Sequence, residues 1–197
     1  MSLLANVHRL LERIALFAVW VGGLALLLAA FMVTIDVLTR KFLNVTMSGA
    51  DEITGYVFAG ATTWAYAYCL LHRSNIRIDA LYNFLPQAVR ALLDIVGVAM
   101  LLLYMGILTL AAVEVFQTSF ENDSVSVTTL LTPLWIPQLV WVSGLVFFVI
   151  CLAFVLAYAI IALFVEGPDA VRPIAGQRTV AEEVKEETHG MQEFERR

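Results

Sequence analysis

The chain has 197 residues, of which 60% are hydrophobic and 15% are charged, and its net charge is −5. About half of it lies in four long segments without a charged residue, so no room remains for a soluble domain with its own hydrophobic core. Lys and Arg form no basic tract, which excludes nucleic acid as a partner. The composition therefore indicates a membrane protein.

Residues 1–13 place apolar side chains at a spacing of three to four residues, which predicts an amphipathic helix. The apolar positions are Leu3, Leu4, Val7, Leu10, Leu11 and Ile14. Such a helix would lie in the cytoplasmic interface of the membrane. A simple N-terminal extension of the first span explains the pattern equally well. The apolar run that follows is too long for a signal peptide, so we expect an uncleaved first span.

Four segments have the length and composition of membrane-spanning helices. They are 14–35, 53–71, 95–113 and 134–165, and each lacks Asp, Glu, Lys and Arg. Because a helix rises ~1.5 Å per residue, ~20 apolar residues cross a ~30 Å hydrocarbon core. We predict an all-α integral membrane protein whose domain, 14–165, contains four transmembrane helices at about 14–38, 52–72, 87–118 and 137–165. The last two are longer than the core is thick and should tilt.

The second span differs from the others in its many small residues. Small side chains allow helix backbones to approach closely in lipid, where van der Waals packing drives association. We therefore expect this span to be the one most enclosed by protein. Tyr56, Trp64, Tyr66 and Tyr68 interleave with the small residues and could fill grooves on a neighbouring helix.

Basic residues that flank the spans predict that both termini are cytoplasmic. The basic residues on that side are Arg9, Arg13, His72, Arg73, Arg77, Arg90, Arg172 and Arg178. The loop between the third and fourth spans carries Glu121 and Asp123 instead, as expected outside. Arg40 and Lys41 break the pattern, because they follow the first span on the outer side.

Two further cytoplasmic segments are predicted. Between the second and third spans, Asp79 could cap a short helix that ends at Pro86. After the fourth span, residues 166–197 contain eight acids and five bases and begin with Gly167-Pro168. This composition predicts a mobile acidic tail.

The polar residues form no recognisable site for chemistry. Hydroxyl groups inside the spans mostly bond back to their own helix; the best candidates are Thr62, Thr63, Thr109 and Ser143. All three histidines lie outside the spans, so they cannot ligate a haem within the bundle. The spacing of Cys and His does not suit zinc. We expect no catalytic residue, no cofactor and no bound metal.

Charged residues at the membrane edges are the candidate contact residues. Asp36 and Arg40 have i,i+4 spacing with the acid first, the favourable order on a helix. Asp51 and Glu52 begin the second span, where the helix dipole favours acids. Either this role or a polar contact to a partner explains these two acids. Trp135 fits the aromatic belt at the outer interface.

A second polar cluster follows the second span on the cytoplasmic side. Its members are His72, Arg73, Asn75, Arg77 and Asp79. These residues could order the loop or contact the phosphate groups of membrane phospholipids.

The order and spacing of several short motifs resemble the small membrane subunit of the tripartite ATP-independent periplasmic (TRAP) transporters, the DctQ-like family. The first span ends in Asp36-Val37-Leu38-Thr39-Arg40, and Ser48-Gly49-Ala50 precedes an acidic pair. Residues 71–79 resemble a cytoplasmic motif of the family, and residues 133–137 resemble its approach to the fourth span. Asn75 departs from the family, which often has histidine there, and the tryptophan that often precedes the acids is absent.

The resemblance implies a scaffold in a bacterial inner membrane. Such subunits pair with a large membrane subunit of about twelve spans, and a periplasmic substrate-binding protein delivers the cargo. An ion gradient, usually of sodium, drives uptake, and the cargo is mostly an organic acid. The small subunit braces the large one and helps to dock the binding protein. The alternatives are a self-contained four-helix channel or transporter and the membrane anchor of another inner-membrane complex.

Overall fold

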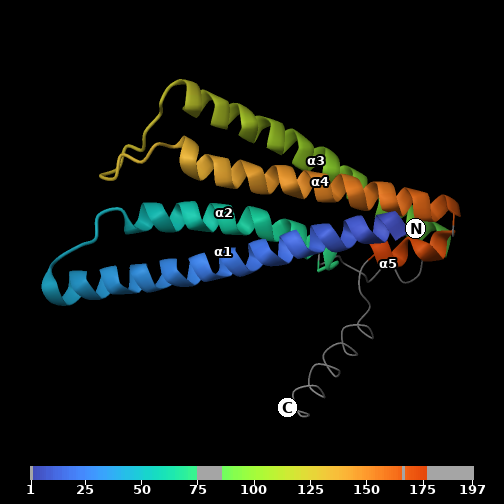
Figure 1. Ribbon diagram of the computed structural model, residues 1–197, viewed down its shortest axis with the longest axis horizontal. Helices are drawn as coiled ribbons and strands as arrows, with labels where there is room; N and C mark the ends of the chain where they lie inside the picture. Colours follow the sequence, from blue (N-terminus) through green and yellow to red (C-terminus); the bar gives the residue numbers. More distant parts are fainter. Residues whose placement is uncertain (1, 75–85, 166, 177–197) are drawn as a thin grey trace, which may run out of the picture.

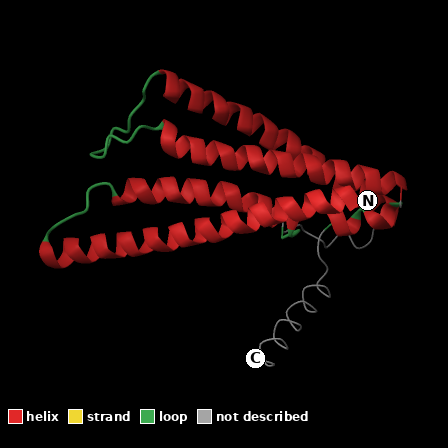
Figure 2. Cartoon of the chain, in the orientation of Figure 1, coloured by secondary structure: helices red, strands yellow, loops and turns green. Residues whose placement is uncertain are grey.

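The computed structural model describes residues 2–74, 86–165 and 167–176, and this part of the chain is helical (Figures 1 and 2). The long helices are α1 (Ser2–Leu43), α2 (Ala50–Leu71), α3 (Gln87–Glu121) and α4 (Trp135–Val165). Two short helices follow, η2 (Pro168–Ala170) and α5 (Arg172–Ala175). The described residues contain no strand, only an isolated β-bridge between Val125 and Pro133. The predicted all-helical class with four long helices is confirmed.

The four helices form a row rather than a closed bundle. α2 packs between α1 and α4, and α4 packs between α2 and α3 (Figure 1). The beginning of α1 and the end of α4 lie together at one end, the terminus end. The connections 44–49 and 122–134 lie at the other, the loop end. A row of this kind leaves each helix with a side that no other described helix covers.

Three of the helices are long and apolar enough to cross a membrane by length and composition: α1 from Leu4 onwards, α3 and α4. α2 has 22 residues, a length of ~33 Å, but it is not among these three, because its many small, hydroxyl and aromatic residues interrupt its apolar run. The structure therefore supports three of the four predicted spans, and α2 as a span remains a prediction.

The first helix is longer than expected. Residues predicted to form a separate interfacial helix, 1–13, continue from Ser2 into the apolar run without a break. Their location at the membrane surface stays a prediction. α1 ends at Leu43, and Asn44 follows with φ 55°, the left-handed conformation that commonly ends a helix. α3 begins directly after Pro86, as expected, because proline is tolerated where a helix starts.

Within this chain the buried core follows α4 more than α2, and the expectation that protein encloses the second span most stays a prediction. Nine residues of α4 are buried, against six of α2. Leu145, Cys151 and Leu152 are the largest fully buried side chains of α4. The physical reason is that α4 packs its larger side chains on both α2 and α3, whereas α2 contributes mainly small ones.

The tail begins with two short helices, and its mobility stays a prediction. η2 and α5 pack against the ends of α3 and α4. Val171 is completely buried there and Ala175 is almost so. Apolar side chains in this otherwise polar segment therefore anchor residues 167–176. The predicted short helix that ends at Pro86 and the tail beyond residue 176 lie outside the described residues.

Candidate functional site

A buried carboxylate, Asp36, fixes the first connection at the loop end. The residue is only 2% exposed, although many of the large apolar side chains of α1 are exposed. Its Oδ2 pairs with the guanidinium of Arg40, one turn later on α1. Its Oδ1 accepts hydrogen bonds from the backbone N–H of Met47 at 2.5 Å and from the Thr46 hydroxyl at 3.2 Å. The expected ion pair forms, and the same carboxylate holds the 44–49 connection against α1.

A second carboxylate, Glu52, ties α2 to the other connection at this end. Glu52 lies half-buried in the first turn of α2, and its Oε1 accepts a hydrogen bond from the Tyr56 hydroxyl at 2.5 Å. Its Oε2 accepts one from the hydroxyl of Thr128, 76 residues later. The hydroxyls of Ser48 and Thr129 bond to each other. These bonds join the 44–49 and 122–134 connections into one rim at the loop end.

The 122–134 connection is also folded on itself. The N–H of Ser126 donates to the carbonyl of Thr132, and the N–H of Leu134 to that of Ser124, both at 2.9 Å. Gly49, with φ 95°, lies beneath the side chain of Leu130, and a Cβ at this position would collide with it. Only glycine satisfies both the conformation and the space at this crossing.

Replacing Glu52 should loosen the rim, whereas replacing its neighbour should not. Glu52→Gln weakens the hydrogen bonds that the hydroxyls of Thr128 and Tyr56 donate to this side chain, because a hydrogen bond to a charged carboxylate is stronger than one to a neutral amide. We expect amide hydrogen exchange in residues 122–134 to accelerate about tenfold or more. Asp51→Asn is the matched control, because Asp51 is exposed and makes no hydrogen bond within the described residues. Equal exchange in the two variants would contradict this role of Glu52.

The other candidate contact residues at the loop end, Arg40, Asp51 and Trp135, differ in how exposed their side chains are to a partner. The side chain of Arg40 is 58% exposed despite its ion pair, and Asp51 is also exposed. Trp135 is half-buried in the first turn of α4 and meets Phe120 of α3 edge-on, with ring centroids 6.1 Å apart. Arg40 and Asp51 therefore present their charges outward, while Trp135 braces α3 against α4.

At the terminus end, the structure describes two members of the predicted cytoplasmic cluster. His72 places Nε2 3.3 Å from a carboxylate oxygen of Glu12 on α1 and stacks on Tyr68. Arg73 follows with φ 53°, just after the end of α2. Asn75, Arg77 and Asp79 lie outside the described residues. The contact of His72 with Glu12 links the beginning of α1 to the end of α2.

Sequence reasoning missed several of these polar groups. Asp94 in α3 is only 2% exposed. It directly precedes the charge-free run 95–113, and this position is the feature of the sequence that could have identified it. Thr46 and Thr128 carried no signal, because each meets its carboxylate only after the chain has folded back.

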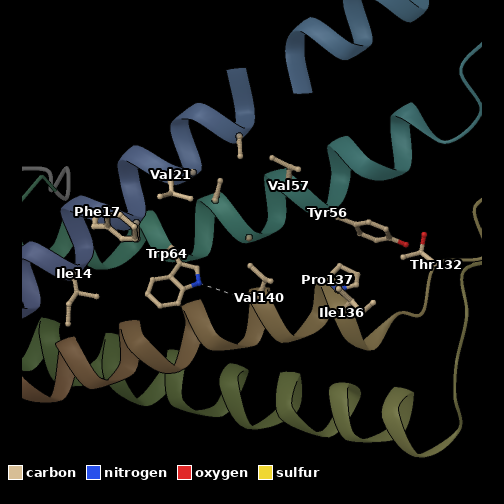
Figure 3. Close-up of a pocket in the computed structure, with 15 residues that line it drawn as sticks. Ile14, Phe17, Val21, Tyr56, Val57, Trp64, Thr132, Ile136, Pro137 and Val140 are labelled. Carbon is tan, nitrogen blue, oxygen red and sulfur yellow. Dashed lines mark hydrogen bonds between the residues drawn. The ribbon is translucent and has the colours of Figure 1, made fainter. Parts of the chain in front are cut away.

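An apolar groove runs along the bundle between α1 and α4, with α2 as its floor (Figure 3). It encloses about 570 Å³. Phe17 and Val21 of α1 and Val140 of α4 line its sides, and Trp64 of α2 lies in it with its indole N–H donated to the Val140 carbonyl at 3.2 Å. Tyr56 and Thr132 bring their hydroxyl groups together at the loop end of the groove.

The polar groups within the helices are used locally. Thr62, Thr63, Thr109 and Ser143 donate to carbonyls of their own helices at 2.7–3.0 Å, as expected. In the described part of the chain, no three His, Cys, Asp or Glu residues are grouped so that they could hold a metal ion. The arrangement suits contacts with other molecules rather than covalent chemistry.

Comparison with known families gives one match. The family model described as "Tripartite ATP-independent periplasmic transporters, DctQ component" matches residues 29–165, which cover all of α2, α3 and α4 and the last third of α1. The comparisons with curated proteins and with solved structures gave no match. The matched segment includes both carboxylates of the rim. The chain belongs to the DctQ component family of the TRAP transporters.

Proposed function

We propose that this chain braces a large membrane subunit of about twelve spans and helps a periplasmic substrate-binding protein to dock on the assembled transporter. The cargo is an organic acid, and an ion gradient, that of Na⁺, drives its uptake across a bacterial inner membrane. Family membership is the basis for these roles, since it makes the chain a multi-pass membrane component of a transport system and not an enzyme.

The shape of the molecule carries the bracing role. Four helices in a row expose two broad apolar faces instead of enclosing a pore. On α1 the most exposed large side chains include Phe17 (71%) and Trp20 (74%), and on α3 they include Leu110 (73%). A transporter that slides one domain against an anchored one needs a wide, stiff footprint in lipid. Two exposed faces would let the row contact the large subunit with one side and lipid with the other.

Charge distribution supports an orientation with both termini in the cytoplasm and with α2 as the fourth span. Arg9, Arg13 and Arg90 lie near the terminus end, whereas the exposed acids Glu121 and Asp123 lie near the loop end. The excess of basic residues marks the cytoplasmic side. Arg40 and Lys41 are the exceptions, and the pairing of Arg40 with Asp36 reduces the energetic cost of its outer location.

Reconstitution tests the proposal. The chain should co-purify with a larger membrane protein, and vesicles that contain both, together with the binding protein, should accumulate a radiolabelled organic acid when a Na⁺ gradient is imposed. A panel of a C4-dicarboxylate, a keto acid, a sugar acid and sialic acid covers the expected cargo. Vesicles that lack this chain, or contain it alone, should accumulate none of them.

Two results would support other functions instead. Flux of solute through vesicles that contain this chain alone would indicate a self-contained channel or transporter. Co-purification with a redox protein, visible as absorbance of a chromophore in the purified complex, would indicate the membrane anchor of another complex.

A further inference from the structure

The last two turns of α1, residues 37–43, project beyond the neighbouring helix α2. Figure 1 shows them passing the beginning of α2, so the 44–49 connection must turn back to reach that helix. Large apolar side chains are exposed here, among them Val37 (53%), Phe42 (70%) and Leu43 (66%). Apolar surface of this kind is unfavourable in water and marks a contact with lipid or protein. The depth and the charges of this segment distinguish between the two.

The length of α1 places these turns at the depth of the lipid headgroups. At ~1.5 Å per residue, the charge-free run 14–35 covers ~32 Å, which matches a ~30 Å hydrocarbon core. The headgroup layers bring the bilayer to ~40–45 Å, so each layer is ~5–8 Å deep. Arg40 and Lys41 follow Ile35 by ~8–9 Å along the helix, a depth that tilt reduces. With the run 14–35 in the core, the two bases therefore lie among the phosphates.

These turns offer both apolar contact and charge. Leu38 and Phe42 are one turn apart on α1 and so share a side of the helix. Lys and Arg at the end of a membrane helix keep their apolar stems along the helix and place their charge at the interface. The ammonium of Lys41 lies 5.6 Å from the centroid of the Phe42 ring. Acyl chains and headgroups of the same lipid could therefore be contacted by adjacent side chains.

One positive charge at this end has no counter-charge in the described part of the chain. Asp36 pairs with Arg40 and so compensates the guanidinium. No described acid lies within ion-pair distance of the Lys41 ammonium. A cation at the depth of the headgroups attracts an anion, and lipid phosphate is the anion of that layer.

Acids of the other helices do not supply the partner that Lys41 lacks. On α2, Glu52 accepts hydrogen bonds from two hydroxyl groups, and the exposed Asp51 forms no ion pair within the described residues. Glu121 and Asp123 lie at the loop end of α3, and α2 and α4 separate that helix from α1 in the row. The α1 edge of the loop end is therefore basic and the α3 edge is acidic. An anionic ligand suits the first and not the second.

We propose that the end of α1 is a binding site for the phosphate of a phospholipid in the leaflet at the loop end. Lys41 contacts the phosphate, and Leu38 and Phe42 lie against the upper part of the acyl chains. Because Asp36 already compensates Arg40, one net positive charge remains, and an anionic phospholipid is preferred over a zwitterionic one. In the proposed orientation, this contact explains why two bases lie on the outer side, where such residues are usually scarce.

Photolabelling of the complex, purified through a tag on this chain and reconstituted in vesicles, tests the site. A phosphatidylglycerol and a phosphatidylcholine each carry the same photoactivatable group next to the phosphate. We expect the anionic lipid to label peptides from residues 37–45 about fivefold more than the zwitterionic one, the effect of one base at a lipid surface. Lys41→Gln should bring this ratio close to one.

Arg9→Gln is the matched control, because it removes an exposed base of α1 at the terminus end and should leave the ratio unchanged. The same ratio in both variants, or no labelling of residues 37–45, would overturn the proposal.

A second measurement keeps Lys41 and identifies what covers the end of α1. A photoreactive residue at Phe42, which is exposed, should form an adduct with phospholipid that mass spectrometry detects. A cross-link to a second polypeptide instead would overturn the proposal, because it would show that protein covers this end. Neither measurement depends on uptake of cargo. Vesicles that keep the labelling preference but accumulate no organic acid would support the lipid site and count against the proposed function.

Discussion

Gly144→Ala is expected to destabilise the helix row, although alanine is a better helix former than glycine. A Cβ at position 144 would lie 2.5 Å from Thr63 Oγ1 and 2.8 Å from Trp64 Cδ1. Both neighbours are held in place: Thr63 donates to its own helix, and Trp64 stacks on Phe147 with ring centroids 5.2 Å apart. The added methyl group must therefore push α4 away from α2.

Overpacking of this kind costs about 1–3 kcal/mol, which exceeds the gain of about 1 kcal/mol in helix propensity. Thermal unfolding in detergent, followed by far-UV circular dichroism, should show the lower melting temperature. Gly144→Leu should lower it further, because its side chain has no space at the same contact.

Gly106→Ala is the matched control for this prediction. Gly106 lies within α3, and a Cβ there would meet nothing within 4 Å. Without a clash, only the helix propensity remains, so this variant should be as stable as the wild type or more stable by up to about 1 kcal/mol. Equal destabilisation of the two variants would show that position 144 is not a special contact between α2 and α4.

The helices could be predicted because hydrophobic length is a property of the sequence itself. A charge-free run such as 95–113 must be helical in lipid, where every backbone polar group needs a partner. The small residues of the second span correctly indicated close contacts, and Gly60 meets Val140 while Gly22 meets Ala61. The order of the row could not be predicted, because the spacing of small residues does not say which neighbour lies on which side.

The contacts of the candidate residues could be predicted only where the two contacting residues lie close together in the sequence. Asp36 and Arg40 are four residues apart, so their spacing was enough. Glu52 and Thr128 are 76 residues apart, and only the packing of α2 against α4 brings the 122–134 connection over the first turn of α2. The sequence therefore offered only the helix dipole or a contact to a partner as explanations for Glu52, and not its bond to another part of the same chain.

Asp36→Ala is expected to release the 44–49 connection from α1. The substitution leaves the N–H of Met47 and the hydroxyl of Thr46 without their acceptor and Arg40 without its counter-charge. An unsatisfied donor in a covered position is more costly than a missing contact at the surface. We expect the melting temperature to fall by about 5 °C or more, and a protease added on the loop side to cleave near residues 44–49.

Two further variants separate the ion pair of Asp36 with Arg40 from the hydrogen bonds that Asp36 accepts. Arg40→Ala removes only the exposed member of the ion pair, and Asp36 keeps its hydrogen bonds from Met47 and Thr46, so the melting temperature should fall less than in Asp36→Ala. Asp36→Asn keeps the size of the side chain and one acceptor oxygen, so it should retain part of the protection against protease that Asp36→Ala loses. If Arg40→Ala is instead the more damaging change, the ion pair and not the bond to Met47 holds the connection.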